Sequence, residues 1–503
     1  MRRVGPKFHT GNGRGQLLAA AAHSGTGSLE AGVTAELAMT RKALAAVCAD
    51  VHDGDSADFS GSEAQRPAGE WAGSAHEPVV VAVPGSTEEA AAIMRVAAEH
   101  DLAVVVRGGG SRLSWGTPPS RCDLVIETSR MSGVVEHAAG DLVARMQAGA
   151  RMGDVAAVLA RAGQEIALDV PGDASVGGVV ASGLAGPRRL RYGTPRDLLI
   201  GITIVRADGT VAKAGGKVVK NVAGYDLGKL FAGSAGTLGL ITEATFRLHP
   251  LAAARAFVTA EYVAVSVACD AVAAAANSQL VSSAVELARD QPAGPIRVGV
   301  LLEGSADGVA ARSVRMAGLL GKAEVSADPP AWWPGPPQAA SGETLVRVSF
   351  WVSALPRVLD AIAAAAAKSG VSPVTGGSAG AGVLYVRVCP GSTATGPALP
   401  GSLTSGCAEA LRWADCRATA EFVGALRRAV AGERGAVVVL TAPAAVREEL
   451  AAHGAGEHGA AEHGAAEHGG MNGTVPGRAL MRAVKDQFDP GHRMAPGRFP
   501  EGI

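Results

Sequence analysis

The sequence predicts an α+β protein with a glycine-rich cofactor-binding half and a second α+β domain built on an antiparallel sheet. The chain has 503 residues, which is too long for one hydrophobic core and indicates two to four domains. Glycine-rich loops follow apolar strands between residues 78 and 250. After Pro250, strands alternate with helices without these glycine loops. The change at Pro250 therefore marks the main domain boundary.

The composition is typical of a globular enzyme with a large interior. Hydrophobic residues make up 48% of the chain and charged residues 18%, the latter below the usual quarter. The formal net charge of −1 gives no electrostatic reason to expect nucleic acid. The six cysteines form no C-x-x-C pair. We therefore expect neither an iron–sulfur cluster nor another metal site in this chain.

Residues 1–76 are predicted to form an N-terminal extension with one candidate helix, Leu37–Cys48. Arg2-Arg3 resembles the start of a twin-arginine signal, but the residues that follow are polar. The chain contains no apolar run of the roughly 18 residues that a membrane-spanning helix needs. The sequence thus predicts a cytoplasmic protein and leaves open an association with the inner face of the membrane.

The glycine-rich half is predicted to cover residues 77–250 and to begin with a strand–helix–strand unit. Val79–Val83 and Leu102–Val106 are apolar runs of strand length, and Ser86-x-x-Glu89 between them has the form of a capping box. The second strand leads into Arg107-Gly108-Gly109-Gly110-Ser111, whose N–H groups can turn toward one phosphate group. Trp115-Gly116 can lay an aromatic plane beside that site. A plain turn is the alternative for this loop.

Two further glycine clusters follow. Pro171-Gly172 and Gly177-Gly178 precede an apolar segment that ends at Ser182-Gly183, and they predict either a second cradle or a tight packing point. The stretch Lys217–His249 contains Gly233–Gly239 and then a predicted strand, Leu240–Leu248. The pattern G-x-G-x-x-G at the start of a helix is not found, which disfavours the common dinucleotide fold.

The order and spacing of these motifs resemble the FAD-binding domain of the vanillyl-alcohol-oxidase/PCMH-type flavoproteins. The segments GLAGPRR (183–189) and KNVAGYDL (220–227) look like the E-subunit branch of bacterial glycolate oxidase within that family. The resemblance implies FAD as cofactor. Many members attach FAD through a His just after the glycines. This chain has Ser111 there, so non-covalent FAD is expected.

The resemblance also implies roles for matching positions. Gly108, Gly109, Gly110 and Ser111 would hold the pyrophosphate, and Gly177, Gly178 and Ser182 would line the flavin and ribityl side. Gly236, Thr237, Leu238, Gly239 and Ile241 would lie along the adenosine–pyrophosphate part. Arg188, Lys220, Asn221 and Tyr225 are candidates for contact with the isoalloxazine, with a solvated surface position as the alternative for Lys220. The remaining candidate wall residues are Arg107, Trp115, Gly116, Pro171, Gly172 and Gly183.

Residues 251–450 are predicted to form the cap or substrate domain. Arg347 in VRVSF and Arg387 in YVRVC are out of phase with the apolar residues of their strands, so both point off the apolar face. If that face looks at the flavin, the two arginines can bind a substrate carboxylate. If it looks at solvent, they are ordinary surface residues.

The end of the chain divides into a low-complexity insert, residues 451–472, and a C-terminal segment, residues 473–503. In the insert His453, His458, His463 and His468 recur every five residues, a period that favours a disordered repeat over a metal site. The C-terminal segment resembles the family's terminal segment, which returns from the cap to the flavin domain. The family commonly has Asn-Pro-Gly-Arg there, where this chain has Ala495-Pro496-Gly497-Arg498.

The resemblance implies a subunit of a glycolate oxidase complex that oxidises glycolate or a related 2-hydroxy acid. In this reaction class a base removes the hydroxyl proton as hydride passes to the flavin. Because the chain has no cysteine cluster, a sister FAD subunit and an iron–sulfur subunit are the expected partners. The chain lacks the His-Gly-Asp-Gly-Asn segment of the sister subunit and has Ala235 where those enzymes usually have Glu. A non-catalytic relay or assembly subunit, or a stand-alone alditol or sugar oxidase, therefore stays open.

Overall fold

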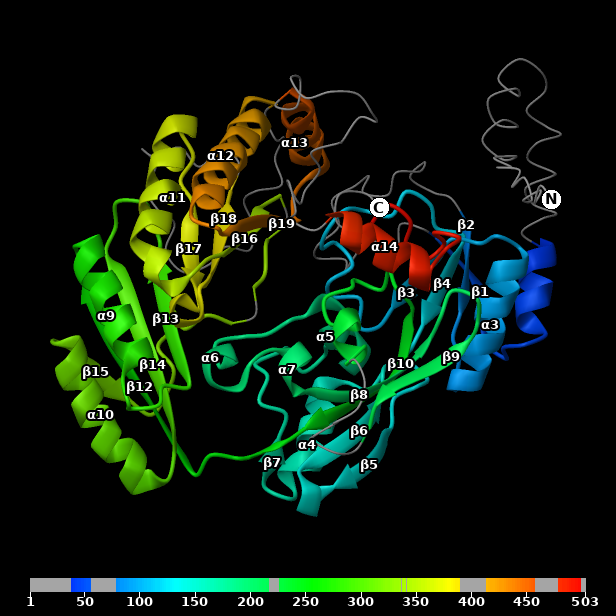
Figure 1. The fold of residues 1–503 in the computed structure, drawn as a ribbon, viewed down its shortest axis with the longest axis horizontal. Coiled ribbons are helices and arrows are strands. Elements are labelled where there is room, and N and C mark those ends of the chain that lie inside the picture. The colour runs from blue at the N-terminus through cyan, green and yellow to red at the C-terminus, as the bar shows by residue number, and fades with distance from the viewer. Residues whose placement is uncertain are drawn as a thin grey trace, which may run out of the picture.

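A computed structural model describes residues 38–55, 78–216, 226–335, 337–340, 342–389, 413–456 and 478–498. Within these residues the chain forms two domains (Figure 1). The first carries a four-stranded and a five-stranded sheet, and the second carries one sheet of eight strands. Lys220, Asn221 and Tyr225, together with most of the His-rich insert, lie outside the described residues.

The four-stranded sheet has the order β1-β2-β4-β3. β2 (Pro78–Ala82), β4 (Leu124–Glu127) and β3 (Val104–Arg107) run parallel, and β1 (Val51–Asp55) is antiparallel to β2. The helix α3 (Thr87–Glu99) starts at Ser86, whose hydroxyl accepts a 3.1 Å hydrogen bond from the Glu89 amide. Residues 38–55, placed by the sequence in an N-terminal extension, thus supply a helix and a strand to this sheet.

The five-stranded sheet is antiparallel and has the order β5-β6-β10-β8-β9. The turn at Asp208-Gly209 joins β8 to β9 as the sequence indicates, and Gly209 has φ +78°. Two short helices, α4 (Met152–Ala160) and α5 (Val176–Ser182), contribute apolar side chains to the core of this sheet. The strands are β5 (Val134–Ala138), β6 (Val143–Gln147), β8 (Leu199–Val205), β9 (Val211–Gly215) and β10 (Leu240–Arg247).

The cap domain is one antiparallel sheet of order β15-β12-β14-β13-β17-β18-β16-β19. Its helices pack on one face and share one apolar core with it. Figure 1 shows α9, α10 and α11 on the side away from the first domain, whereas α13 lies nearer to it. The strands are β12 (Ala254–Tyr262), β13 (Ala284–Arg289), β14 (Ile296–Gly304), β15 (Glu324–Ser326), β16 (Thr344–Ser349), β17 (Val374–Gly377), β18 (Val383–Val388) and β19 (Ala436–Thr441). The helices that complete this core are α9 (Val265–Asn277), α10 (Ala306–Leu320), α11 (Leu355–Ser369), α12 (Trp413–Gly432) and α13 (Ala444–Gly456).

The chain returns to the first domain at its end. The helix α14 (Arg478–Phe488) follows the cap in sequence but lies over the first domain in Figure 1. The segment that follows α14 in sequence pairs with β3: the Val104 amide donates to Arg493 O at 2.7 Å, and the Ala495 amide donates to Val104 O at 2.8 Å. These bonds place Ala495 and Arg498 beside the glycine-rich loop that follows β3. No helix in the described part of the chain is long and apolar enough to cross a bilayer.

Candidate cofactor and substrate site

A cavity of about 360 Å³ lies where the two domains and the C-terminal segment meet. Its floor is made of loops of the first domain, including Gly108–Ser111, Trp115-Gly116, Gly177-Gly178 and Gly233–Gly236. Arg347, Val438 and Leu440 line it from the cap, and Met481, Ala495 and Arg498 line it from the C-terminal segment. The Gly116 amide donates to Leu440 O at 2.7 Å, which joins the glycine loops to β19 at the edge of the cavity.

Ser175 holds the first two glycine loops together. Its Oγ accepts 3.2 Å hydrogen bonds from the amides of Gly109 and Gly178, and it caps the start of α5. A Cβ on Gly108 would collide with this hydroxyl, and a Cβ on Gly177 would come within 2.9 Å of Ala148 Cβ. These two glycines are therefore needed for close packing, and that packing sets the two loops edge to edge along the cavity. Ser182 closes the helix, and its Oγ donates to Gly178 O at 2.7 Å.

The third loop keeps the cavity open. Gly233 and Gly236 have φ values of +85° and +75°, and Ala235 between them has φ +53°. A Cβ on Gly233 would meet nothing within 4 Å, and one on Gly236 only Val106 Cβ at 3.9 Å. Side chains at these positions would thus project into open space and narrow the cavity. Gly239 and Ile241 also line it, but Thr237 and Leu238 are buried behind the loop.

Three arginines supply the charge of the cavity: Arg112, Arg347 and Arg498. No carboxylate is found among the described residues that line it. Buried nitrogen atoms of all three arginines, and the Ser234 hydroxyl, have no hydrogen-bond partner in the described part of the chain. Burial lowers the pKa of Arg112 and Arg347 and brings that of Arg498 to about 10. Buried polar groups normally have partners, so these orphaned donors fit an anionic ligand such as the pyrophosphate of FAD.

Arg347 is placed by strand alternation. Its neighbours Val346 and Val348 belong to the core under the cap helices, so Arg347 is on the opposite face and lines the cavity. The sequence leaves open whether this face of the strand points to solvent or to the flavin domain. In the structure it points toward the first domain. Arg387 occupies the same face two residues beyond Tyr385, but it is not among the residues that line the cavity.

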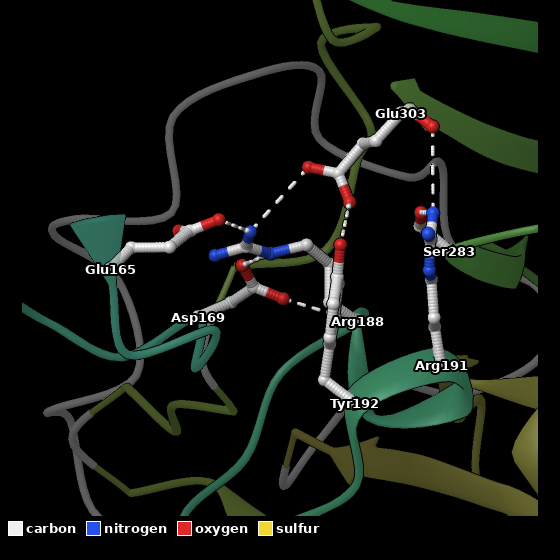
Figure 2. Close-up of polar contacts among 7 residues, drawn as sticks. All are labelled: Glu165, Asp169, Arg188, Arg191, Tyr192, Ser283 and Glu303. Carbon is white, nitrogen blue, oxygen red and sulfur yellow. Dashed lines mark hydrogen bonds and ion pairs between the residues drawn. The ribbon is translucent and has the colours of Figure 1, made fainter. Parts of the chain in front are cut away.

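Arg188, predicted to contact the isoalloxazine, does not line the cavity. Figure 2 shows it surrounded by carboxylates from both domains. Its guanidinium is 2.7 Å from Asp169, 2.8 Å from Glu165 and 3.4 Å from Glu303 in β14 of the cap. Burial by itself would lower the pKa of Arg188, but these carboxylates hold it above its ordinary value. Arg188 therefore ties the cap to the first domain.

The other predicted positions surround the cavity without lining it. Arg107 forms a 2.9 Å ion pair with Glu127 on the neighbouring strand. Gly172 O accepts a hydrogen bond from the Gly153 amide at the start of α4, and Gly183 ends α5 with φ +64°. Pro171 precedes Gly172 in the same turn. These residues shape the loops around the cavity.

Ser175, Arg112, Ser234 and the lining role of Arg498 were not predicted from the sequence. A signal existed for Ser175, because a Ser immediately before an apolar segment of helical length is typical of an N-cap. Arg112 directly follows the first glycine loop. Nothing local distinguishes Arg498, which reaches the cavity only because the C-terminal segment folds back over β3.

Comparisons with known proteins agree with this geometry. Residues 78–215 match the family model of the FAD binding domain. The chain is 34% identical to glycolate oxidase subunit GlcD of Bacillus subtilis over 221 residues, which cover 43% of this chain and 46% of that protein. It is 37% identical to glycolate oxidase subunit GlcE of Escherichia coli over 150 residues, which cover 29% of this chain and 42% of that protein. The chain thus spans less than half the length of these curated relatives.

The fold continues beyond the region of sequence similarity. The structure of p-cresol methylhydroxylase superposes with a TM-score of 0.63 at 14% identity, covering 93% of this chain and 97% of that one. At this identity the likeness concerns the fold alone. The predicted fold class, a two-part PCMH-type FAD-binding domain followed by an α+β cap with an antiparallel sheet, is confirmed. Residues 78–215 thus match the FAD binding domain, and the chain as a whole has the fold of p-cresol methylhydroxylase.

Proposed function

We propose that this chain is an FAD-dependent oxidoreductase that oxidises glycolate or a related 2-hydroxy acid to the 2-oxo acid. The proposal is supported by its similarity to glycolate oxidase subunits over the FAD-binding half. The observation that carries it is a cavity with glycine-rich loops on one side and, on the other, Arg347 of the cap, whose Nε has no partner among the described residues. The first feature suits a dinucleotide, and the second suits a small carboxylate.

The residues of the first domain would hold the cofactor. The loops at Gly108–Ser111, Gly177-Gly178 and Gly233–Gly236 expose backbone to the cavity, and consecutive amides without Cβ atoms suit a pyrophosphate. Arg112 and Arg498 can add positive charge to this part. Bound FAD would supply the hydride acceptor of the reaction. Ser111 stands where many relatives attach FAD, and we propose that the cofactor is held without a covalent bond.

Arg347 would bind the carboxylate of the substrate. It is the charged group that the cap sheet contributes to the lining, and burial lowers its pKa because the side chain is removed from water. A carboxylate that replaces the missing solvent would form charge-assisted hydrogen bonds with its guanidinium. The guanidinium would thereby orient the α-carbon toward the glycine-lined floor and exclude water from that end of the cavity. Lys220, Tyr225 and Arg387 remain predicted contributors.

Electrons must leave the chain after the oxidation. The described residues contain no cluster of His, Cys, Asp or Glu that could hold a metal ion, and the sequence has no C-x-x-C pair. We propose a sister FAD subunit and an iron–sulfur subunit as partners. Ala235, in the position where those catalytic relatives usually have Glu, lines the cavity. This favours, as second candidate, a subunit that binds FAD but relays electrons or supports assembly.

Anaerobic addition of glycolate to the purified, FAD-loaded chain distinguishes these functions. Bleaching of the oxidised flavin absorbance by the chain alone supports catalysis here. Bleaching only after the sister subunit is added would assign the oxidation to that subunit. Hydrogen peroxide formed in air from a polyol, without partners, would instead indicate a stand-alone oxidase. Arg347→Met tests the site, because Arg347 lines the cavity and its loss should abolish reduction while FAD stays bound. Arg357→Met, at an exposed arginine of the cap that pairs with Glu433, is the matched control and should leave reduction unchanged.

A further inference from the structure

A row of polar side chains crosses the face of the cap sheet that is turned toward the first domain. Leu287 pairs with Gly377, so the preceding Glu286 in β13 stands opposite Ser378 at the end of β17. On the next two strands Tyr385 pairs directly with Arg347. Alternate residues of paired strands share one face of a sheet. The row therefore leads from Glu286 to Arg347 at the cavity.

Arg189 lies against this row from the first domain. It belongs to α6 (Arg189–Tyr192), which packs on β13. Its guanidinium donates a 3.0 Å hydrogen bond to the Tyr385 hydroxyl and also bonds Ala185 O. The same guanidinium lies 5.9 Å from the centroid of the Tyr385 ring. Arg189 thus holds the aromatic residue that stands next to Arg347.

Glu286 is a buried carboxyl without a full set of partners. Only 1% of it is exposed, and its Oε1 has no hydrogen-bond partner in the described part of the chain. Ser378 forms a hydrogen bond with it, and the positive charge of Arg189 favours its ionised form through space. Burial raises its pKa to about 7, against the smaller lowering effects of Ser378 and Arg189. The charged groups on its own strand and on the elements around it are Asp169, Arg188, Arg189, Arg191, Arg289, Arg297, Glu303, Arg347 and Arg387.

We propose that Glu286 is a positioning residue for the anionic substrate, acting through Arg189 on the pair of Tyr385 and Arg347. When Glu286 is neutral, the charge of Arg189 is uncompensated, and an anion bound at Arg347 experiences two nearby cations. When Glu286 is ionised, its negative charge offsets that of Arg189 through space. Anion affinity should therefore fall as pH rises through the neutral range. The identification of the anion as a 2-hydroxy acid rests on the proposed function.

Oxalate is a suitable probe because it resembles a 2-hydroxy acid, cannot donate a hydride and stays a dianion above about pH 6. We would titrate it into the FAD-loaded chain at about pH 6 and about pH 8.5 and follow the visible flavin spectrum. The dissociation constant of the unmodified chain should rise about tenfold between the two, the effect of one compensated charge at moderate distance. In Glu286→Gln the dissociation constant should be the same at both pH values. In Glu286→Asp, which keeps a carboxyl group, the dissociation constant should again rise with pH.

Glu343→Gln is the matched control, because Glu343 is also a buried carboxyl of the cap, but it accepts a hydrogen bond from the Ala340 amide and plays no part in the contact between the domains. It should keep the pH dependence of the unmodified chain, and thermal unfolding would verify that each variant is folded. An equal rise in Glu286→Gln, or no spectral response to oxalate at any pH, would overturn the inference. If oxalate binds with the expected pH dependence but glycolate does not reduce the flavin, the inference stands and the proposed oxidation fails. If glycolate reduces the flavin but Glu286→Gln leaves the pH profile unchanged, the proposed oxidation stands and the inference fails.

Discussion

Replacement of Asp489 by Asn should destabilise the first domain strongly. Asp489 is fully buried, and its Oδ2 lies 2.7 Å from the Nζ of Lys485, which is also fully buried. The same Nζ donates to Thr237 O at 2.7 Å and to Met494 O at 2.8 Å. One ammonium group thus joins α14, the glycine loop 233–239 and the segment that carries Arg498 to the cavity.

The magnitude follows from the burial of both charges. Removing one partner of a buried ion pair leaves an uncompensated charge, which costs about 3–5 kcal/mol. Asn can still accept one hydrogen bond, but it cannot neutralise Lys485. Burial already lowers the pKa of Lys485, while Asp489 raises it. Without Asp489 the folded-state pKa falls further below the unfolded value, so the variant should regain stability as pH rises toward about 10.

Urea unfolding followed by circular dichroism, with FAD content measured in parallel, checks this prediction. The matched control is Glu421→Gln, which breaks another i,i+4 pair, with Arg417, on the exposed face of α12. Its cost should be on the order of 0.5 kcal/mol or less. The double variant Lys485→Met/Asp489→Leu should be less destabilised than Asp489→Asn, because no charge remains buried. Equal small losses in Asp489→Asn and Glu421→Gln would refute the reasoning.

Three further predictions concern the cofactor and pH. Glu286 has an ordinary pKa of 4.5 and a folded-state pKa of about 7, a difference worth about 3 kcal/mol. The folded state keeps this proton while the unfolded chain releases it, so stability should fall by that amount from about pH 4.5 to about pH 7. Glu286→Gln should flatten this slope in urea titrations, and an unchanged slope would contradict it. Gly236→Val should lower FAD content at least tenfold through its +75° φ and the lost space, whereas normal content would count against the loop as cradle. Acid precipitation should release all flavin, because Ser111 replaces the attaching His; flavin retained in the pellet would disprove this.

Local sequence was enough to find the floor of the cavity. Gly108–Gly110 follow a predicted strand, Gly177-Gly178 precede an apolar segment, and Gly236 precedes a predicted strand. Glycines clustered at such boundaries indicate a sharp turn or a close approach of the backbone. The Arg347 side chain was also placed on one face by alternation. Whether that face points to the cavity or to solvent depends on how the cap docks on the first domain. This contact joins residues far apart in the chain, so local sequence does not predict it.

Arg188 shows the limit of such reasoning. A cation within a flavoprotein motif suggests a contact with the flavin, but Arg188 is held by three carboxylates. One of them, Glu303, is 115 residues away in sequence. Nothing local in the sequence predicts strands β12, β13 and β17, because their apolar residues show no clear period of two. Their existence depends on pairing with β14 and β18 across the finished sheet.

The two domains contribute different chemistry to the cavity, so a mutation can weaken substrate binding without weakening cofactor binding. The glycine loops of the first domain are fixed by Ser175 and by the Lys485 contacts, neither of which involves the cap. Arg347 depends on the cap, whose contacts with the first domain include Arg188–Glu303, Arg189–Tyr385 and the Gly116–Leu440 hydrogen bond. A change in cap position therefore moves the charge that would receive the substrate while leaving the cradle for the cofactor intact. Loss of substrate binding with FAD retained is the expected result of any weakening of the Arg188 contact with Glu303.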